Sequence, residues 1–280
     1  MDLTSKKIVT IDLDRKTYEV SNQTNLHKYI GGVGLALKLF QMYEERDPLI
    51  FAIGPLNGFF PFASKTAIVL NDSGTVEDIY LGGTLSTRLK FTGIDAVVLL
   101  GKLNEAAVVE ITDTVASFKN IETDINSLGL PGKRSVLSLT KTKAFLDYEF
   151  TSHEYLLETK LAQKNIGGIV ITGSEIYSPN EFSKYQEVYI SVLNRKGELL
   201  VGESNKPSCS NCPAGCEKSR YGEIGGNVFV HSLVACQYAE KIYSDISTSF
   251  ACLNSLGYDY THEDLENLQH LVEETLRAIG

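Results

Sequence analysis

The residues best suited to chemistry are three cysteines that lie within one short stretch of the chain. The sequence has five cysteines, and Cys209, Cys212 and Cys216 form the pattern C-x2-C-x3-C. Pro213 and Gly215 favour a tight, non-helical backbone, which would allow the three thiolates to converge on one centre. Small neighbouring residues would let main-chain N–H groups approach the sulfurs, as they do around iron–sulfur clusters. The pattern therefore predicts a [4Fe-4S] cluster.

The fourth ligand of such a cluster is less clearly marked. Cys236 and Cys252 are the remaining cysteines, and both lie in segments predicted to be helical, where a lone cysteine is often a small buried apolar residue. Cys236 is favoured because it is closer in sequence, with Cys252 as the alternative. A cluster held by three cysteines, with a non-cysteine or open fourth position, fits the pattern equally well.

Two other cysteine chemistries compete with the cluster. A structural zinc site usually has two separated pairs of ligands, and here only His231 or Cys236 could complete it. A thioredoxin-like C-x-x-C motif should follow a strand and open a helix, and it leaves Cys216 unexplained. The cluster is therefore favoured over zinc, and both are favoured over a purely structural role for the thiols.

Composition and charge limit the classes of function. The 280 residues carry a net charge of −9 and have a pI near 5.1, without a dense run of lysine or arginine, which disfavours nucleic-acid binding. Apolar runs such as residues 96–100 are far shorter than the ~18 residues of a membrane span. The first residues lead into a strand-like pattern with no apolar leader, so we expect a cytoplasmic location, where clustered thiols stay reduced.

The elements that would position the cysteines begin with a strand-rich part of the chain. Residues 7–13 and 17–20 alternate like the strands of a hairpin, and residues 48–53 and 65–70 read as buried strands. Residues 35–43 have a helical pattern after a glycine-rich turn. This mixture predicts an α+β fold.

An internal repeat organises the strand-rich part. Residues 85–101 align without gaps to residues 157–173, at a constant offset of 72. Each copy reads as a helix end, a tight turn and a buried strand that ends at a glycine; a chance likeness between two common units is the alternative. We therefore predict a duplicated, β-rich platform domain with pseudo-two-fold symmetry over residues 1–200, followed by a small all-helical segment.

Residues 201–280 form the second predicted unit, which carries the cysteine motif. Helical patterns begin near His231 and Ile246, and residues 261–264 resemble a capping box that starts a last helix. A helical segment of this size has only a small core of its own, so it should pack on the first unit or on a partner.

Several motifs, in the same order along the chain, resemble the tungsten-dependent aldehyde:ferredoxin oxidoreductases. Besides the three cysteines they are residues 31–36 (GGVGLA), 48–58 (PLIFAIGPLNG), 82–83 (GG), 89–96 (LKFTGIDA), 164–165 (KN), 169–171 (IVI) and 253–259 (LNSLGYD). The resemblance implies a duplicated β-rich first domain that carries a tungsten bis-pterin, two helical domains, and a [4Fe-4S] cluster beside the pterin. Full members are much longer, so it implies a truncated member: the first domain and the start of the second, without the third domain that supplies the family's fourth cluster cysteine.

Departures from the family pattern decide which functions the resemblance implies. Lys65 stands where the family has an arginine, and Tyr80 stands where it has an asparagine before a Gly-Gly turn. Glu158 brings a negative charge to the segment where the family has a glycine-rich, arginine-containing loop. The positions that the resemblance still assigns to a pterin are Lys65, Gly82 and Gly83. A tungsten or molybdenum pterin is therefore disfavoured, and no catalytic residue is identified.

The resemblance implies an iron–sulfur oxidoreductase, or a subunit of one, that acts on aldehyde or oxo groups. It would move electrons between the active site of a larger oxidoreductase subunit and ferredoxin; a homo-oligomer stays open. One alternative is a pterin-metal aldehyde oxidoreductase in its own right. The other is a non-enzymatic binding scaffold stapled by zinc or by a cluster.

Overall fold

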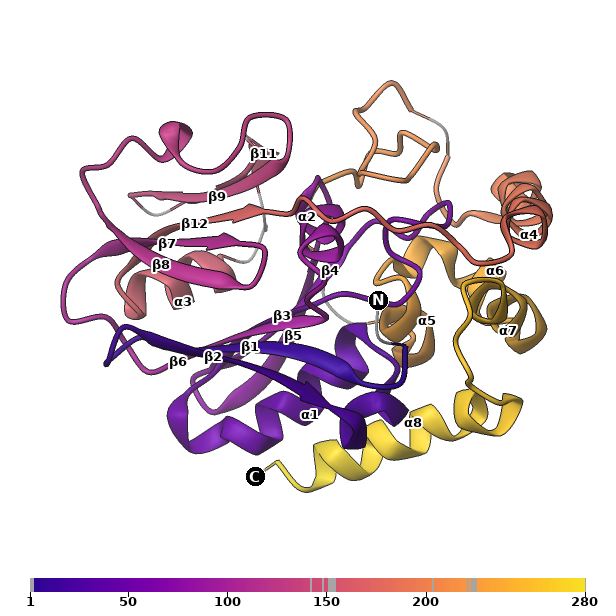
Figure 1. Cartoon of the computed structure of the whole chain (residues 1–280), viewed down its shortest axis with the longest axis horizontal. Coiled ribbons are helices and arrows are strands. Elements are labelled where there is room, and N and C mark those ends of the chain that lie inside the picture. Colours follow the sequence, from indigo (N-terminus) through magenta and orange to yellow (C-terminus); the bar gives the residue numbers. More distant parts are fainter. Residues whose placement is uncertain are drawn as a thin grey trace.

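Two mixed β-sheets and a set of helices make up the chain, which confirms the α+β class (Figure 1). The computed structural model describes residues 3–141, 143–147, 149–150, 155–202, 204–220, 222 and 226–279. No helix within these ranges combines the length and the apolar character that crossing a membrane requires.

The first sheet is built from the N-terminal third of the chain and has the order β2-β1-β6-β3-β4-β5. Its strands are β1 (Lys6–Asp12), β2 (Thr17–Gln23), β3 (Leu49–Ala52), β4 (Thr66–Asp72), β5 (Thr75–Leu81) and β6 (Ala96–Leu100). The central strand β6 runs parallel to β1 and antiparallel to β3. The predicted hairpin and buried strands are therefore present.

The second sheet has the order β11-β10-β9-β12-β7-β8. Its strands are β7 (Ala107–Thr112), β8 (Val115–Asn120), β9 (Arg134–Thr140), β10 (Lys143–Leu146), β11 (Glu149–Phe150) and β12 (Ile166–Thr172). Strand β12 runs parallel to β7 and antiparallel to β9, so this sheet repeats both the strand order and the pairing of the first.

The aligned sequence repeat forms equivalent elements in the two sheets. Residues 85–101 contain helix α2 (Leu85–Phe91) and the central strand β6, and residues 157–173 contain most of α3 (Leu156–Gln163) and the central strand β12. Contacts after the two central strands are exchanged. Past β6, the Leu103 N–H donates to the Lys164 carbonyl beside α3 (3.1 Å), whereas past β12 the Glu175 N–H donates to the Phe91 carbonyl of α2 (2.8 Å).

The two faces of the first sheet belong to different hydrophobic clusters. One cluster fills the space between the sheets, with alternate residues of β1, β6, β7 and β12 and the apolar sides of α2 and α3. The other lies on the opposite face of the first sheet, under α1 (Gly32–Tyr43) and helices from the C-terminal part of the chain. This alternation explains why the central strand β6 is buried at every position.

The C-terminal helices share their core with the first sheet. They are α4 (Phe182–Asn194), α5 (Val228–Leu233), α6 (Glu240–Tyr243), α7 (Ile246–Ser255) and α8 (His262–Arg277). Helices α5 and α8 pack on α1, and α4 packs on α7 (Figure 1). Helix α8 begins with the predicted capping box, in which Thr261 and Asp264 cap each other.

Two details of the helices differ from the sequence prediction. Helix α1 starts at Gly32, inside the segment predicted as a turn, because Gly31 and Gly32 lie against the backbones of Ile53 and His231. Cys236 was predicted to lie in a helix, and this prediction is wrong. The residue precedes the short 3-10 turn Gln237–Ala239 in an extended conformation, since α5 ends at Leu233 and Ala235 takes a positive φ of 56°.

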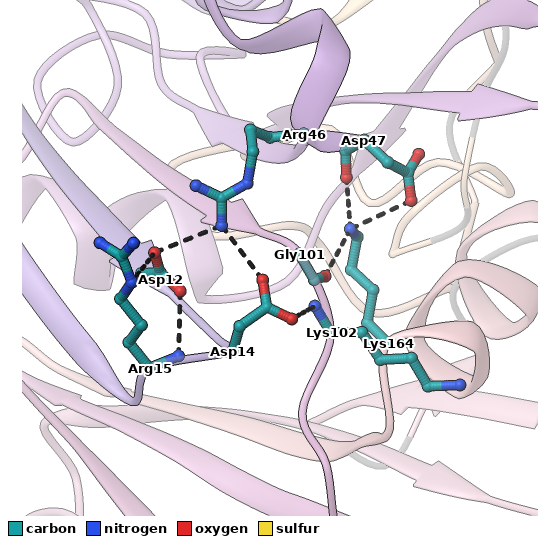
Figure 2. A network of polar contacts seen from close by, with 8 residues as sticks. All are labelled: Asp12, Asp14, Arg15, Arg46, Asp47, Gly101, Lys102 and Lys164. Carbon is teal, nitrogen blue, oxygen red and sulfur yellow. Dashed lines mark hydrogen bonds and ion pairs between the residues drawn. The ribbon is translucent and has the colours of Figure 1, made fainter.

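A polar network joins the two repeat units (Figure 2). Lys164 donates to both the main-chain oxygen and the carboxylate of Asp47, and to the Gly101 carbonyl (3.0 Å). Lys160 of α3 donates to the other oxygen of the same carboxylate (2.6 Å). Both lysine side chains are almost fully buried, so Asp47 compensates two cations that water does not reach.

Replacing Asp47 by asparagine should destabilise the protein. Burial alone would raise the pKa of this carboxyl, but the hydrogen bond from Lys160 and the charges of both lysines outweigh it and hold the pKa below its usual value. The Asp47→Asn change should lower the free energy of unfolding in urea by about 2 kcal/mol at neutral pH, because it leaves buried cations without a counter-charge.

The same variant should show a defined pH dependence. Because the native pKa of Asp47 is lowered, its stabilisation is present above the ordinary carboxyl pKa and is lost as the pH falls through the native value. Wild type and variant should therefore converge in strong acid. Glu45→Gln, at a neighbouring exposed position, is the control and should behave like wild type. Equal stability of Asp47→Asn and wild type at neutral pH would contradict this role.

Candidate metal centre

The cysteine loop, residues 208–216, lies on the turn that joins β5 to α2. The Ser210 N–H donates to the Gly83 carbonyl (3.1 Å), and the Thr87 hydroxyl donates to the Ser210 hydroxyl (2.7 Å). The Phe62 N–H donates to the Asn211 carbonyl (3.0 Å). The fold thus brings the cysteines to Gly82 and Gly83, which the sequence placed more than a hundred residues earlier in the chain.

Main-chain N–H groups contact two of the sulfurs. The Arg220 N–H donates to the Cys209 sulfur (3.1 Å), and the Ala214 N–H donates to that of Cys212. Cys209 and Cys216 are buried, and Cys212 is partly buried. Amide donors of this kind favour sulfur that carries negative charge, which suits thiolates bound to iron.

The surroundings of Cys212 include the other two thiols of the loop. The pKa of Cys212 is raised to about 11: burial is the largest cause and the charges of Cys209 and Cys216 add to it, whereas the Ala214 N–H and the Lys65 charge oppose it. The loop therefore gathers three thiols beside one cation. Across the described ranges, however, no three histidine, cysteine or acidic side chains converge closely enough to hold a metal ion.

The remaining two cysteines lie in the core beside Tyr243. The Tyr243 hydroxyl is buried and donates to the Pro61 carbonyl (2.6 Å). Its pKa is raised well above the usual value, first by burial and then by Cys252, Cys236 and Cys212. Cys252 is fully buried in α7, and burial also raises the pKa of its thiol. Tyr243 thus has Cys212 of the loop and both candidate fourth ligands in its surroundings.

His231, the alternative zinc ligand, packs against the family-divergent Tyr80. The two rings stack with centroids 3.7 Å apart at 30°, and both side chains are buried. The Nε2 atom of His231 lies so close to Gly226 that a Cβ there would be 2.0 Å away. The imidazole is therefore held by packing on Tyr80 and Gly226.

The positions assigned to a pterin are covered by this chain's own atoms. A Cβ on Gly82 would lie 2.2 Å from the Cys209 sulfur, and one on Gly83 would lie 3.2 Å from a methyl group of Leu146. The ammonium group of buried Lys65 donates to the Lys218 carbonyl, just beyond the cysteine loop (3.2 Å). In this arrangement the three positions do not fit a bound pterin, whereas soft thiol donors with amide contacts have the chemistry of a cluster site.

No residue type in the sequence marks the two amide donors. Arg220 and Ala214 act through main-chain N–H groups, which every residue except proline carries, so no side-chain type marks them. The sequence feature that could have indicated this contact is Gly82 itself. A sulfur can occupy the space beside this backbone only because glycine has no side chain there.

Adding a methyl group at Gly82 should displace the cysteine loop. Gly82→Ala would bring its Cβ against the Cys209 sulfur and the Arg220 nitrogen, which would lie at 2.2 and 2.8 Å. Cys209, now only 4% exposed, should then react at least about tenfold faster with a thiol reagent, as measured by peptide mass mapping of the labelled residue.

Gly197→Ala is the matched control, since a Cβ there meets nothing within 4 Å. It should leave the labelling rate unchanged. If Cys209 in Gly82→Ala is labelled at the wild-type rate, the loop does not depend on this contact.

Comparison with known proteins agrees with the fold. Residues 8–142 match the sequence family described as aldehyde ferredoxin oxidoreductase, N-terminal domain. Over 120 residues the chain is 31% identical to the tungsten-containing aldehyde ferredoxin oxidoreductase of Pyrococcus horikoshii, in a match that covers 38% of this chain and 20% of that protein.

A solved structure shares the fold over almost the whole chain. It is the active site complex BamBC of benzoyl coenzyme A reductase in complex with 1,5 dienoyl-CoA, with a TM-score of 0.61 and 13% identity. The similarity covers 98% of this chain and 63% of that one, so the chain spans only part of the length of both relatives. Through residues 8–142, the chain is therefore similar to the N-terminal domain of the aldehyde ferredoxin oxidoreductases.

Proposed function

We propose that this chain is an electron-transfer component of an oxidoreductase, in which Cys209, Cys212 and Cys216 hold a [4Fe-4S] cluster. The observation that carries the proposal is the position of the cysteine loop, seated on Gly82 with main-chain N–H groups at two of its sulfurs. A loop built only to fill space would not need three thiols beside a buried cation and amide donors.

The environment of the loop supports iron over zinc. Burial of the sulfurs and amide donors to them are the features with which proteins set the potential of iron–sulfur clusters. Burial holds the pKa of Cys212 above its usual value and the Lys65 charge opposes this shift, so metal binding would release the proton of this thiol. Since the thiols are close but do not converge, binding would draw the loop tighter around the cluster.

Cys236 is the proposed fourth ligand, with Cys252 as the alternative. Cys236 lies outside the helices in an extended segment, where the backbone can adjust. Cys252 is fixed on α7 with no exposed surface. Both thiols raise the pKa of Tyr243, as does that of Cys212, so all three lie in the surroundings of its hydroxyl.

The electron partners are proposed from the relatives. A bound cluster would supply one-electron transfer: it would accept an electron from a larger oxidoreductase subunit and give it to ferredoxin, or the reverse. A chain of an active site complex shares this fold, which supports the proposal that this protein binds a second, larger subunit. Association with a second copy of this chain is the alternative. We place the protein in the cytoplasm, where the thiols would stay reduced before metal binding.

The domain organisation is part of the proposal. We infer that residues 1–200 are a duplicated platform with a pseudo-two-fold axis and that residues 201–280 begin a second domain. Identical sheet topologies and the exchanged bonds of Leu103 and Glu175 support the axis, because reciprocal contacts are typical of two-fold related units.

Metal analysis after anaerobic purification and reconstitution with iron and sulfide tests the proposal. We expect ~4 iron and ~4 sulfide per chain, with the visible absorption and EPR signal of a cluster after reduction. Cys212→Ser and Cys216→Ser should lose most of the iron. Cys252→Ala should retain it, whereas Cys236→Ser should lower the iron content or the stability of the cluster.

Each alternative has its own outcome. One zinc per chain without a chromophore would replace the proposal by a zinc-stapled scaffold. Tungsten or molybdenum with a pterin would replace it by complete catalysis, and would require the cysteine loop to leave Gly82. Protein that binds no metal under argon would refute all metal-based functions.

A further inference from the structure

A cavity of about 450 Å³ lies between α2, the segment after β12 and α4. Its lining includes Phe59, Arg88, Phe91, Lys133 and Tyr185. This volume is within the range of small-molecule sites. We propose that the cavity binds a small organic carboxylate with a flat apolar body, and that Arg88 holds the carboxylate.

Arg88 is a cation with spare hydrogen-bonding capacity. One of its terminal nitrogens donates to the Gly132 carbonyl (2.7 Å), and the guanidinium lies 5.9 Å from the centre of the Phe91 ring. Its Nε atom is buried and has no hydrogen-bond partner in the structure. Burial lowers the pKa of Arg88, a shift that the charge of Asp147 opposes. A partly desolvated guanidinium of this kind gains most from a carboxylate, which it can bind with two parallel hydrogen bonds.

The equivalent position in the other repeat unit already has its carboxylate. Lys160 occupies the position of Arg88 in the aligned repeat, and it donates to Asp47 at 2.6 Å. Asp47 is the residue after Arg46, whose carbonyl accepts the N–H of Gly101 (3.1 Å). Figure 2 shows that the Asp47 carboxylate also accepts a hydrogen bond from Lys164.

In the unit that carries the cavity, the residue that corresponds to Asp47 has the opposite charge. The N–H of Gly173, the counterpart of Gly101, donates to the carbonyl of Lys133 (3.2 Å). Lys133 therefore corresponds to Arg46, and the next residue, Arg134, corresponds to Asp47. Among the described residues, no acidic side chain forms an ion pair with Arg88. An external carboxylate would fill the role that Asp47 fills for Lys160.

The walls of the cavity define the rest of the ligand. Phe59, Phe91, Phe182 and Tyr185 supply aromatic surfaces, which favour a flat apolar body. Glu175 also lines the cavity, with its carboxylate accepting a hydrogen bond from Tyr177 (2.6 Å). Its negative charge disfavours ligands that carry two carboxylates. The cavity therefore fits an aromatic monocarboxylate better than a dicarboxylate or a neutral molecule.

A tryptophan reporter makes the test direct, because the sequence contains no tryptophan. Phe182→Trp places one at the partly exposed wall of the cavity. Benzoate should change its fluorescence saturably, whereas benzamide, which has the same shape without the charge, should bind at least about tenfold more weakly. In the same background, Arg88→Gln should weaken benzoate binding at least about tenfold.

Arg277→Gln, on the exposed end of α8, is the control for a general loss of positive charge and should leave the affinity unchanged. Lys133→Gln removes an exposed cation at the rim and keeps the test valid if Arg88→Gln does not fold; it should weaken binding about threefold at low salt. Equal affinity for benzoate and benzamide, or a fluorescence change that never saturates, would overturn the proposal. The measurement needs no metal, so its outcome is independent of the cluster.

Discussion

The cysteine loop can lie on the first sheet only because Gly82 has no side chain. The Cys209 sulfur and the Arg220 backbone occupy the space that a Cβ would need. This contact fixes where the loop meets the turn between β5 and α2, and the bonds from Ser210 and Thr87 hold it there. The Gly82–Gly83 turn, which the resemblance assigned to a pterin, thus contacts the Cys209 sulfur instead.

A rigid platform is needed for such a contact to persist. The two sheets share one apolar core, and the segments that leave their central strands exchange hydrogen bonds with each other's helices. Since α2 both ends in this exchange and begins beside Gly83, the exchange and the cysteine loop stabilise the same short helix. On the far face, α1, α5 and α8 complete the core of the first sheet. The loop therefore rests on an element that is held from both sheets.

Local sequence patterns predicted most helices and strands. They did not predict contacts between residues that are distant in the sequence. Alternation and the repeat predicted β1, β6 and β12, because one buried face or full burial leaves a clear apolar pattern. The prediction of a helix at Cys236 was wrong, since a positive φ at Ala235 interrupts an otherwise helical apolar pattern. The seating of Cys209 on Gly82 and the burial of Lys65 against Lys218 depend on chain segments far apart in sequence, so no spacing encodes them. The sequence showed Arg88 only as one position of the aligned repeat and did not indicate a binding role for it.

The two repeat units differ in how the charge of an equivalent helix cation is compensated. Each places a cation of its helix, Lys160 or Arg88, against the linker before a strand of the other sheet. In one unit Asp47 neutralises the cation and closes the interface. In the other, Arg134 stands at that position and the space beside Arg88 is a cavity. A partly buried cation without an ion-pair partner is costly, so such a position persists more readily if a ligand supplies the charge.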